Sequence, residues 1–259
     1  MTETIFAPDT HLHDQSLWLV EQLRLTAFIT PAFQPPKESY FERVVGESAT
    51  TKVEDRRKGV LIEQGPFQGG ILGVQIQPFR IDWILGADPE KEKGDEGITF
   101  EAVGEFESVA NAFRDTLAKW LAQELPVKRL AFGAILVMPV ESRRAGYERL
   151  GRFLPTVKID PVNSSDFLYQ INRWTKSNEM SGLTINRLAK WIVAQKSLSQ
   201  LAIPSLTSHP LAQTQACRVE LDINTSAEFE GELPQAKLNS LFSELINFGI
   251  EIVKKGDMV

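Results

Sequence analysis

The chain has 259 residues, a formal net charge of −6 and an isoelectric point near 5.3. Its 42% hydrophobic and 24% charged residues are typical of a globular protein and exclude a disordered or fibrous chain. The acidic balance removes any general attraction to nucleic-acid backbones or anionic lipid, and no apolar run approaches the roughly 18 residues of a membrane span.

The chain begins with a polar segment, 1–16, whose lack of periodicity predicts an extended N-terminal arm. Residues 1–9 do not combine a basic stretch with an apolar one, so they do not resemble a secretory leader, and we expect a cytoplasmic protein. The first ordered element is a strand over 17–29, because apolar side chains recur at every second position from Leu23 to Ile29.

A short helix, a meander of strands and a long helix complete the first half. The helix over 37–45 precedes a polar strand over 50–63 and two further strands between residues 71 and 85, which predict an antiparallel meander. The glycine-rich segment 65–70 is followed by strand-forming residues rather than a helix, so it predicts a hairpin turn and not a phosphate-binding loop. Apolar residues at helical spacing predict the long helix over 105–123.

The same order recurs from residue 126. It comprises a strand over 127–137, a helix over 143–153, strands over 167–174, 184–193 and 215–223, and a helix that begins at Pro234. At one constant spacing, the first-half residues Val20, Leu23, Ala27 and Tyr40 correspond to Val127, Leu130, Ala134 and Tyr147. We therefore predict an internal duplication in which only the arm and the segment 195–214 lack a counterpart.

The predicted fold class is α+β, with two pseudo-repeated β-α-β-β-β-α units forming one largely antiparallel sheet and helices on one face. The units cover 17–125 and 126–259 and make one composite domain, because each has a single-sided sheet and an amphipathic helix that need a shared core. This element order resembles the duplicated saddle of TATA-binding-like folds. The resemblance includes no diagnostic residues and does not by itself imply DNA binding.

His11 and His13 form the pattern that most suggests metal chemistry, within the string Asp9-Thr10-His11-Leu12-His13-Asp14. Two imidazoles separated by one residue can share a metal, as in amidohydrolase-like enzymes. Such a site needs further histidines, and of the 3 in the chain only His209 remains. A polar arm without metal is the alternative reading, and no cofactor is expected.

Two basic clusters are candidate sites for nucleic acid or an acidic partner: Arg56, Arg57 and Lys58 in the first half, and Arg143 and Arg144 in the second. If the fold placed both on one surface, they could bind phosphates together, with aromatic residues stacking on bases. Scattered, solvated charges are the alternative.

Several other polar or aromatic residues have a structural reading beside a functional one. The five tryptophans lie mostly in apolar periodic contexts, which predicts core positions rather than a base-stacking platform. Cys217, the only cysteine, lies in an alternating strand pattern and is expected in the core. Asp82 and Asp222 lie in corresponding strands, where a cross-strand ion pair or an exposed face position is the alternative to a paired functional site.

Four strings distributed along the chain, VEQLRLTAFIT (20–30), GPFQGG (65–70), FRIDWIL (79–85) and VELDINT (219–225), make it similar to an uncharacterised, sporadically distributed bacterial protein family. The resemblance covers nearly the whole chain and assigns no catalytic residue. The family's patchy distribution implies an accessory role in mobile-element or antiviral-defence gene clusters.

These observations together favour a non-enzymatic interaction protein, a scaffold subunit of a larger bacterial assembly. Its expected partners are other proteins or a second copy of the chain, contacted through the arm and the segment 195–214. One alternative is a nucleic-acid-binding protein that uses the saddle sheet or the arginine clusters. Another is a metal-dependent hydrolase that uses His11 and His13.

Overall fold

The computed structural model describes residues 18–30, 38–88, 98–202 and 207–258. The strands within these ranges are β1 (Leu19–Ile29), β2 (Thr51–Asp55), β3 (Val60–Phe67), β4 (Gly70–Gln77), β5 (Arg80–Ala87), β6 (Val127–Val140), β7 (Leu168–Lys176), β8 (Thr184–Ala202) and β9 (Thr207–Thr225). The α-helices are α1 (Tyr40–Val45), α2 (Phe106–Leu121), α3 (Arg143–Phe153) and α4 (Leu238–Lys255). Short 3₁₀ turns, Gln235–Lys237 and Gly256–Met258, flank α4.

All nine strands form one sheet in the order β2-β3-β4-β5-β1-β6-β9-β8-β7. Every neighbouring pair is antiparallel. The first strands of the two halves, β1 and β6, pair at the centre, where Leu25 lies opposite Phe132. The α+β class and the single antiparallel sheet are therefore confirmed.

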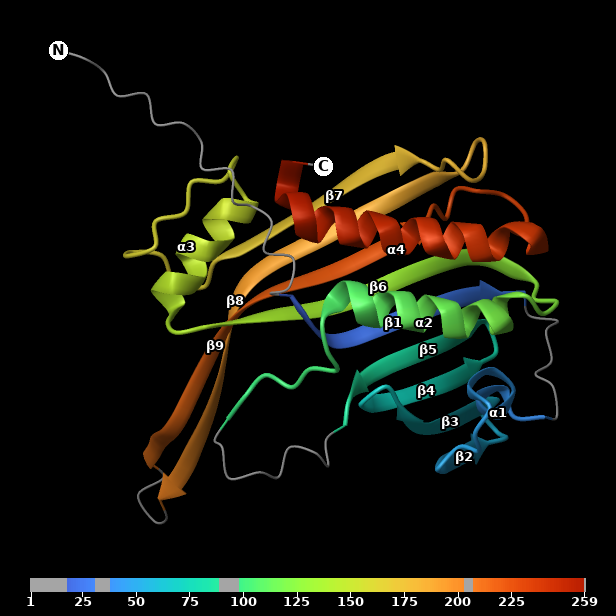
Figure 1. The fold of residues 1–259 in the computed structure, drawn as a ribbon, viewed down its shortest axis with the longest axis horizontal. Coiled ribbons are helices and arrows are strands. Elements are labelled where there is room, and N and C mark those ends of the chain that lie inside the picture. The colour runs from blue at the N-terminus through green and yellow to red at the C-terminus, as the bar shows by residue number, and fades with distance from the viewer. Residues whose placement is uncertain (1–17, 31–37, 89–97, 203–206, 259) are drawn as a thin grey trace.

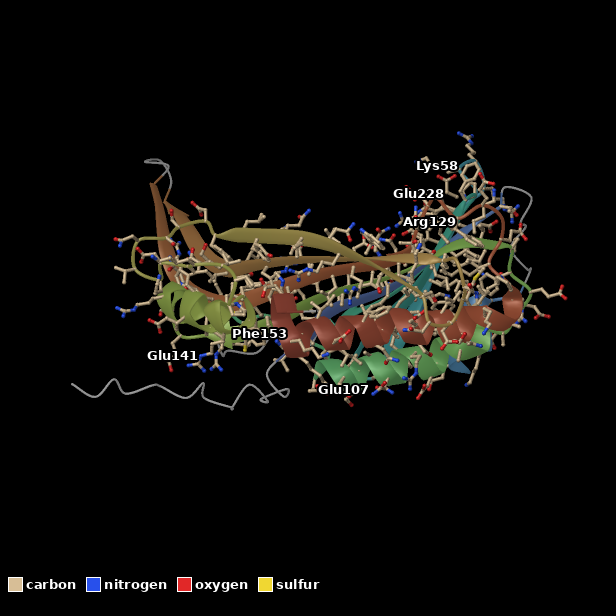
Figure 2. All side chains as sticks on the ribbon, turned by 90° about the horizontal axis from the view of Figure 1, so that it is seen from above. Lys58, Glu107, Arg129, Glu141, Phe153 and Glu228 are labelled. Carbon is tan, nitrogen blue, oxygen red and sulfur yellow. The ribbon has the colours of Figure 1, made fainter. Side chains whose placement is uncertain are left out.

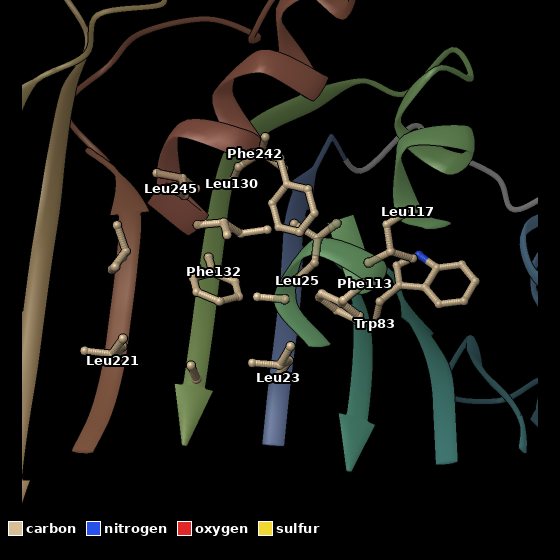
Figure 3. Close-up of a cluster of buried hydrophobic side chains, with 14 of the residues drawn as sticks. Leu23, Leu25, Trp83, Phe113, Leu117, Leu130, Phe132, Leu221, Phe242 and Leu245 are labelled. Atoms are coloured by element: carbon tan, nitrogen blue, oxygen red, sulfur yellow. The ribbon is translucent and has the colours of Figure 1, made fainter. Parts of the chain in front are cut away.

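The four helices pack on one face of the sheet, as predicted (Figure 1). Helices α2 and α4 lie side by side over the central strands, while α1 packs on β3 and β4 and α3 packs on β8 and β9. In the core between these layers, the ring of Phe242 lies 6.2 Å from that of Phe113 and 6.3 Å from that of Phe132 (Figure 3). One continuous apolar cluster thus joins elements of both halves.

A turn that the sequence pattern did not predict divides the expected strand over 50–63 into β2 and β3. Asp55 accepts hydrogen bonds from the backbone N–H groups of Arg57 and Lys58, and Gly59 adopts a φ of 64°. An aspartate that binds the following backbone amides and a glycine with positive φ make a tight turn. The first half therefore has four strands after α1, one more than the predicted unit.

The glycine-rich segment does form a hairpin turn, as predicted. Gln68 and Gly69 both have positive φ values, 47° and 83°, and join β3 to β4 with Phe67 opposite Gly70. Two consecutive residues with positive φ match the right-handed twist of the flanking strands. Gly65 belongs to β3 rather than to the turn.

Residues 195–202 and 207–214, for which the sequence pattern predicted no strand, continue β8 and β9 as a pair of strands. Pairing of β6 with β9 ends at Val140 opposite Gln215, whereas β8 and β9 continue to pair with each other as far as Ala202 and Thr207. The two strands form a hairpin arm that extends beyond the sheet at lower left in Figure 1.

None of the helices within the described ranges is long and apolar enough to cross a membrane.

Candidate functional site

The face of the sheet opposite the helices, here called the open face, carries no helix in the described part of the chain (Figures 1 and 2). Side chains alternate between the two faces of a strand. At the centre of the open face, Arg24 of β1, Gly133 of β6 and Asp222 of β9 therefore lie side by side. Near the arm, Phe100 covers one end of this face by packing on Val137 and Ala216.

A hollow of about 360 Å³ lies in the middle of the open face. Its floor includes Gly133, and an added Cβ there would lie only 3.3 Å from Arg24 Nε. The absence of a side chain at this position lets the Arg24 guanidinium lie close to the sheet. The polar groups that line the hollow come from four strands: Gln22, Arg24, Gln170, Lys190, Glu220 and Asp222.

Ion pairs neutralise only part of the charge in the hollow. Lys190 Nζ lies 3.1 Å from Glu220 Oε2, and Arg218 Nε lies 3.7 Å from the other oxygen of the same carboxylate. Arg24 has no ion pair within the described chain, and its buried Nε has no hydrogen-bond partner there. A buried donor without a partner is costly unless a bound group satisfies it. Lys190, the other cation that lines the hollow, is paired with Glu220, so Arg24 is the lining cation whose charge no carboxylate of the described residues neutralises.

Beside the hollow, three asparagines of neighbouring strands form a hydrogen-bonded group, here called the Asn row. Asn172 Nδ2 donates to Asn186 Oδ1 at 3.4 Å, and Asn186 Nδ2 donates to Asn224 Oδ1 at 3.2 Å. Asn224 also accepts from Arg129 Nη2 and donates to Asp222 Oδ1. Amide side chains carry both donors and acceptors, so the row can bind either kind of polar group.

Trp174 of β7 lies at the end of the Asn row, directly opposite Asn186. Its side chain is 68% exposed, whereas the other four tryptophans are at most 2% exposed. The prediction of core positions is thus right for Trp18, Trp83, Trp120 and Trp191 and wrong for Trp174. The physical reason is strand alternation, because Trp174 shares its face with the exposed Gln170 and Lys176.

Asp82 is buried and has a structural role, but its ion pair is not the expected cross-strand one, because Arg80 lies two residues away on the same strand β5. Its buried carboxylate accepts from Thr26 Oγ1 at 2.6 Å and from Arg80 Nε at 2.5 Å. Asp222 lies elsewhere, in the lining of the hollow. Two strands, β1 and β6, lie between β5 and β9, so the two carboxylates do not form a pair.

The fold does not place the two basic clusters on one surface. Arg56, Arg57 and Lys58 lie in the turn after edge strand β2, while Arg143 and Arg144 begin α3 near β8 and β9, at the other end of the sheet. Figure 2 shows this separation through Lys58, which belongs to the first cluster, and Glu141, which lies two residues before the second. Arg56 pairs with Glu54, and Arg144 pairs with Glu148, both at 2.9 Å. The combined phosphate-binding surface considered from the sequence is therefore not formed.

His11 and His13 lie outside the described residues. Within the described ranges, no group of three or more histidine, cysteine or acidic side chains is arranged to hold a metal ion. Cys217 is buried on the helix side, and its Sγ donates to the Gly146 carbonyl at 3.4 Å. Burial raises the pKa of the Cys217 thiol to about 12, despite the opposing charge of Arg149. The core assignment of this cysteine is confirmed by its burial.

The sequence reading missed Arg24, the Asn row and Trp174. A signal for Trp174 and Asn172 was present, since the string LYQINRWTK of β7 alternates and places both on the face of Gln170 and Lys176. Contact between the three asparagines could not be read from the chain, because it depends on the register of β7, β8 and β9.

Fold and site together define an α+β protein with an open, polar sheet face. In three comparisons with known proteins, no family model matches the chain and no curated protein or solved structure is significantly similar to it.

Proposed function

We propose that this chain is a non-catalytic binding protein, a scaffold subunit that holds a partner on the open face of its sheet. The observation that carries the proposal is the hollow, where polar side chains of four strands surround an arginine that has no ion-pair partner among the described residues. A concave site with a few convergent polar groups is the usual form of a binding site. Displaced pKa values do not mark the open face: three of the groups that have them pack on the helix side of the sheet, namely Tyr40, Glu63 and Cys217.

The hairpin arm of β8 and β9 supports a scaffold role. Beyond Gln195 and Gln215 the two strands pair with each other and extend past the rest of the sheet. Such an extended pair of strands can contact a second protein while the open face holds its partner. We propose that the arm contacts protein subunits of the assembly.

Site-specific photo-crosslinking tests which face is used. A crosslinking residue is placed at Gln170, exposed in the hollow, and in a matched variant at Lys119, exposed on α2. We expect crosslinks to a partner from position 170 and none from position 119 in cells that express the neighbouring genes. Crosslinks from position 119 alone, or none from either position, would contradict the proposal.

We also propose that the two halves descend from one duplicated unit. Apart from β2, the strand order is symmetric about the β1–β6 pair, with β5 and β9, β4 and β8, and β3 and β7 in corresponding places. The family resemblance supports placing the assembly in a mobile-element or antiviral-defence system. We expect genes of such a system beside the gene for this protein. Their absence from its neighbourhood would contradict the assignment to such a system.

A further inference from the structure

Trp174 is an aromatic side chain that the fold does not use for packing. It is 68% exposed on β7, the edge strand of the sheet. Single nucleic-acid strands are bound by proteins that stack bases on exposed aromatic side chains.

The groups beside Trp174 suit the edges of bases. Asn186 lies directly opposite it across the β7–β8 pair, and Asn172 lies two residues before it on the same face. Amide groups can pair with the donors and acceptors of an unstacked base. Asp222, bound to Asn224 at 3.0 Å, adds an acceptor for base amino groups.

Three cations that have no ion-pair partner in the described part of the chain lie around this surface. Lys176 Nζ lies 5.9 Å from the centroid of the Trp174 ring and donates to the Thr184 hydroxyl. Arg129 is held by the Thr225 carbonyl and Asn224, and Arg24 lies in the hollow. None of the three has a carboxylate partner within the described chain. A neutral saccharide could bind to the indole and the amides alone, whereas the phosphates of a nucleic acid would also bind to these cations.

We propose that the open face binds single-stranded nucleic acid, with a base stacked on Trp174, base edges bonded by the Asn row, and phosphates held by Lys176, Arg129 and Arg24. This inference rests on the proposed function, because it names the partner that the open face holds. A duplex keeps its base faces stacked, so the site selects single strands.

Tryptophan fluorescence tests the stacking directly, because Trp174 is the only one of the five tryptophans that is exposed. The full chain is titrated with fluorescein-labelled dT and U oligomers of about 12 nucleotides and with a duplex, at low and high salt. We expect quenching of the exposed emission by the single strands, weak binding of the duplex, and an affinity that falls with salt.

Three variants separate the contributions. Trp174→Ala should lower the affinity measured by anisotropy roughly 5- to 150-fold, the loss of one stacked base. Trp174→Phe should keep most of the affinity while the quenching disappears. Lys176→Ala should reduce the slope of log affinity against log salt by about 1. Phe79→Ala is the matched control, since Phe79 is 61% exposed at the β4–β5 turn, and it should bind like the wild type.

The outcomes distinguish this inference from the proposed function. No binding of single strands at low salt, or unchanged binding by a folded Trp174→Ala variant, would overturn the inference. Salt-independent quenching by neutral oligosaccharides without oligonucleotide binding would also overturn it. If crosslinks from position 170 then reach a protein, the open face is still the binding surface and only its nucleic-acid assignment fails.

Discussion

Among single residues, Glu63 shows how one buried carboxylate joins a helix to the sheet. Its side chain is fully buried and accepts hydrogen bonds from Ser39 Oγ at 2.8 Å, the Phe41 backbone N–H at 3.1 Å and Lys52 Nζ at 2.8 Å. Burial alone would raise the pKa of Glu63, but the hydrogen bonds from Lys52, Phe41 and Ser39 and the charge of Lys52 together lower it. The ionised form therefore anchors the first turn of α1 to β3.

Glu63→Gln is expected to lower the free energy of unfolding at pH 7 by about 1.5–3 kcal/mol, the range for hydrogen bonds to a charged group. A carboxyl whose pKa is lower in the folded state stabilises the protein above its unfolded pKa, about 4.3 for glutamate, and loses this effect as the pH falls through the folded pKa. The difference between variant and wild type should therefore shrink below about pH 4. Urea denaturation at a series of pH values measures it.

Glu54→Gln is the control for this measurement, because Glu54 is a half-exposed carboxylate of β2 that pairs with Arg56. Exposed ion pairs contribute about 0–1 kcal/mol, so this variant should stay close to the wild type. A Glu63→Gln difference that is the same at pH 3 and pH 7 would contradict the role assigned to the ionised carboxylate.

At the scale of elements, the glycines of two helices show how closely each helix approaches the sheet. An added Cβ at Gly249 of α4 would lie 3.0 Å from the ring of Phe132 and 3.4 Å from Ile223 and Leu221. At Gly151 of α3, an added Cβ would have no atom within 4 Å. Helical spacing identifies both helices, but only the packed structure shows which glycine is required.

Gly249→Ala is expected to destabilise the protein by about 1–3 kcal/mol, because the added methyl overpacks the contact between α4 and the sheet. Gly151→Ala is expected to be neutral or to stabilise by up to about 1 kcal/mol, since alanine has the higher helix propensity. Thermal and urea denaturation of the two variants check this pair. Equal effects at both positions would show that α4 does not lie as close to β6 as described.

Most elements could be predicted because each is encoded by a local pattern. The predicted bounds of the helix over 143–153 match α3 (Arg143–Phe153), which begins with a Ser142 cap. The misses occurred where a local pattern was ambiguous: a polar run, 50–63, contained two strands and a turn, and the polar segment 195–214 contained strands of the arm. Polar strands that gain little burial carry a weak periodic signal.

For the whole molecule, the central β1–β6 pair makes the two halves depend on each other. The rings of Phe132 and Phe242 meet over the centre of the sheet, and the apolar cluster that includes them extends into both halves. Neither half can bury its central strand alone, so the described chain is expected to unfold in one cooperative transition.

Phe132→Ala tests this coupling and is expected to cost about 3–5 kcal/mol. Far-UV circular dichroism and tryptophan fluorescence should still follow one coincident transition, because tryptophans of both halves are buried in the same cluster. Ile135→Ala on the opposite face of β6 is the control and should cost less, since Ile135 is partly exposed in the hollow. Two separate transitions, with only one shifted by Phe132→Ala, would show independent halves.

The sequence by itself determined the α+β class, the order of most elements and the core faces of β1 and α2, because periodicity of two or 3.6 residues follows from local backbone geometry. It could not determine which distant side chains meet. Strand order and register decided that the basic clusters lie far apart, that Arg24 lies beside Gly133, and that Trp174 and the asparagines share one exposed surface. These contacts depend on pairing between strands that are far apart in the chain, and a shift of one residue would move each side chain to the other face.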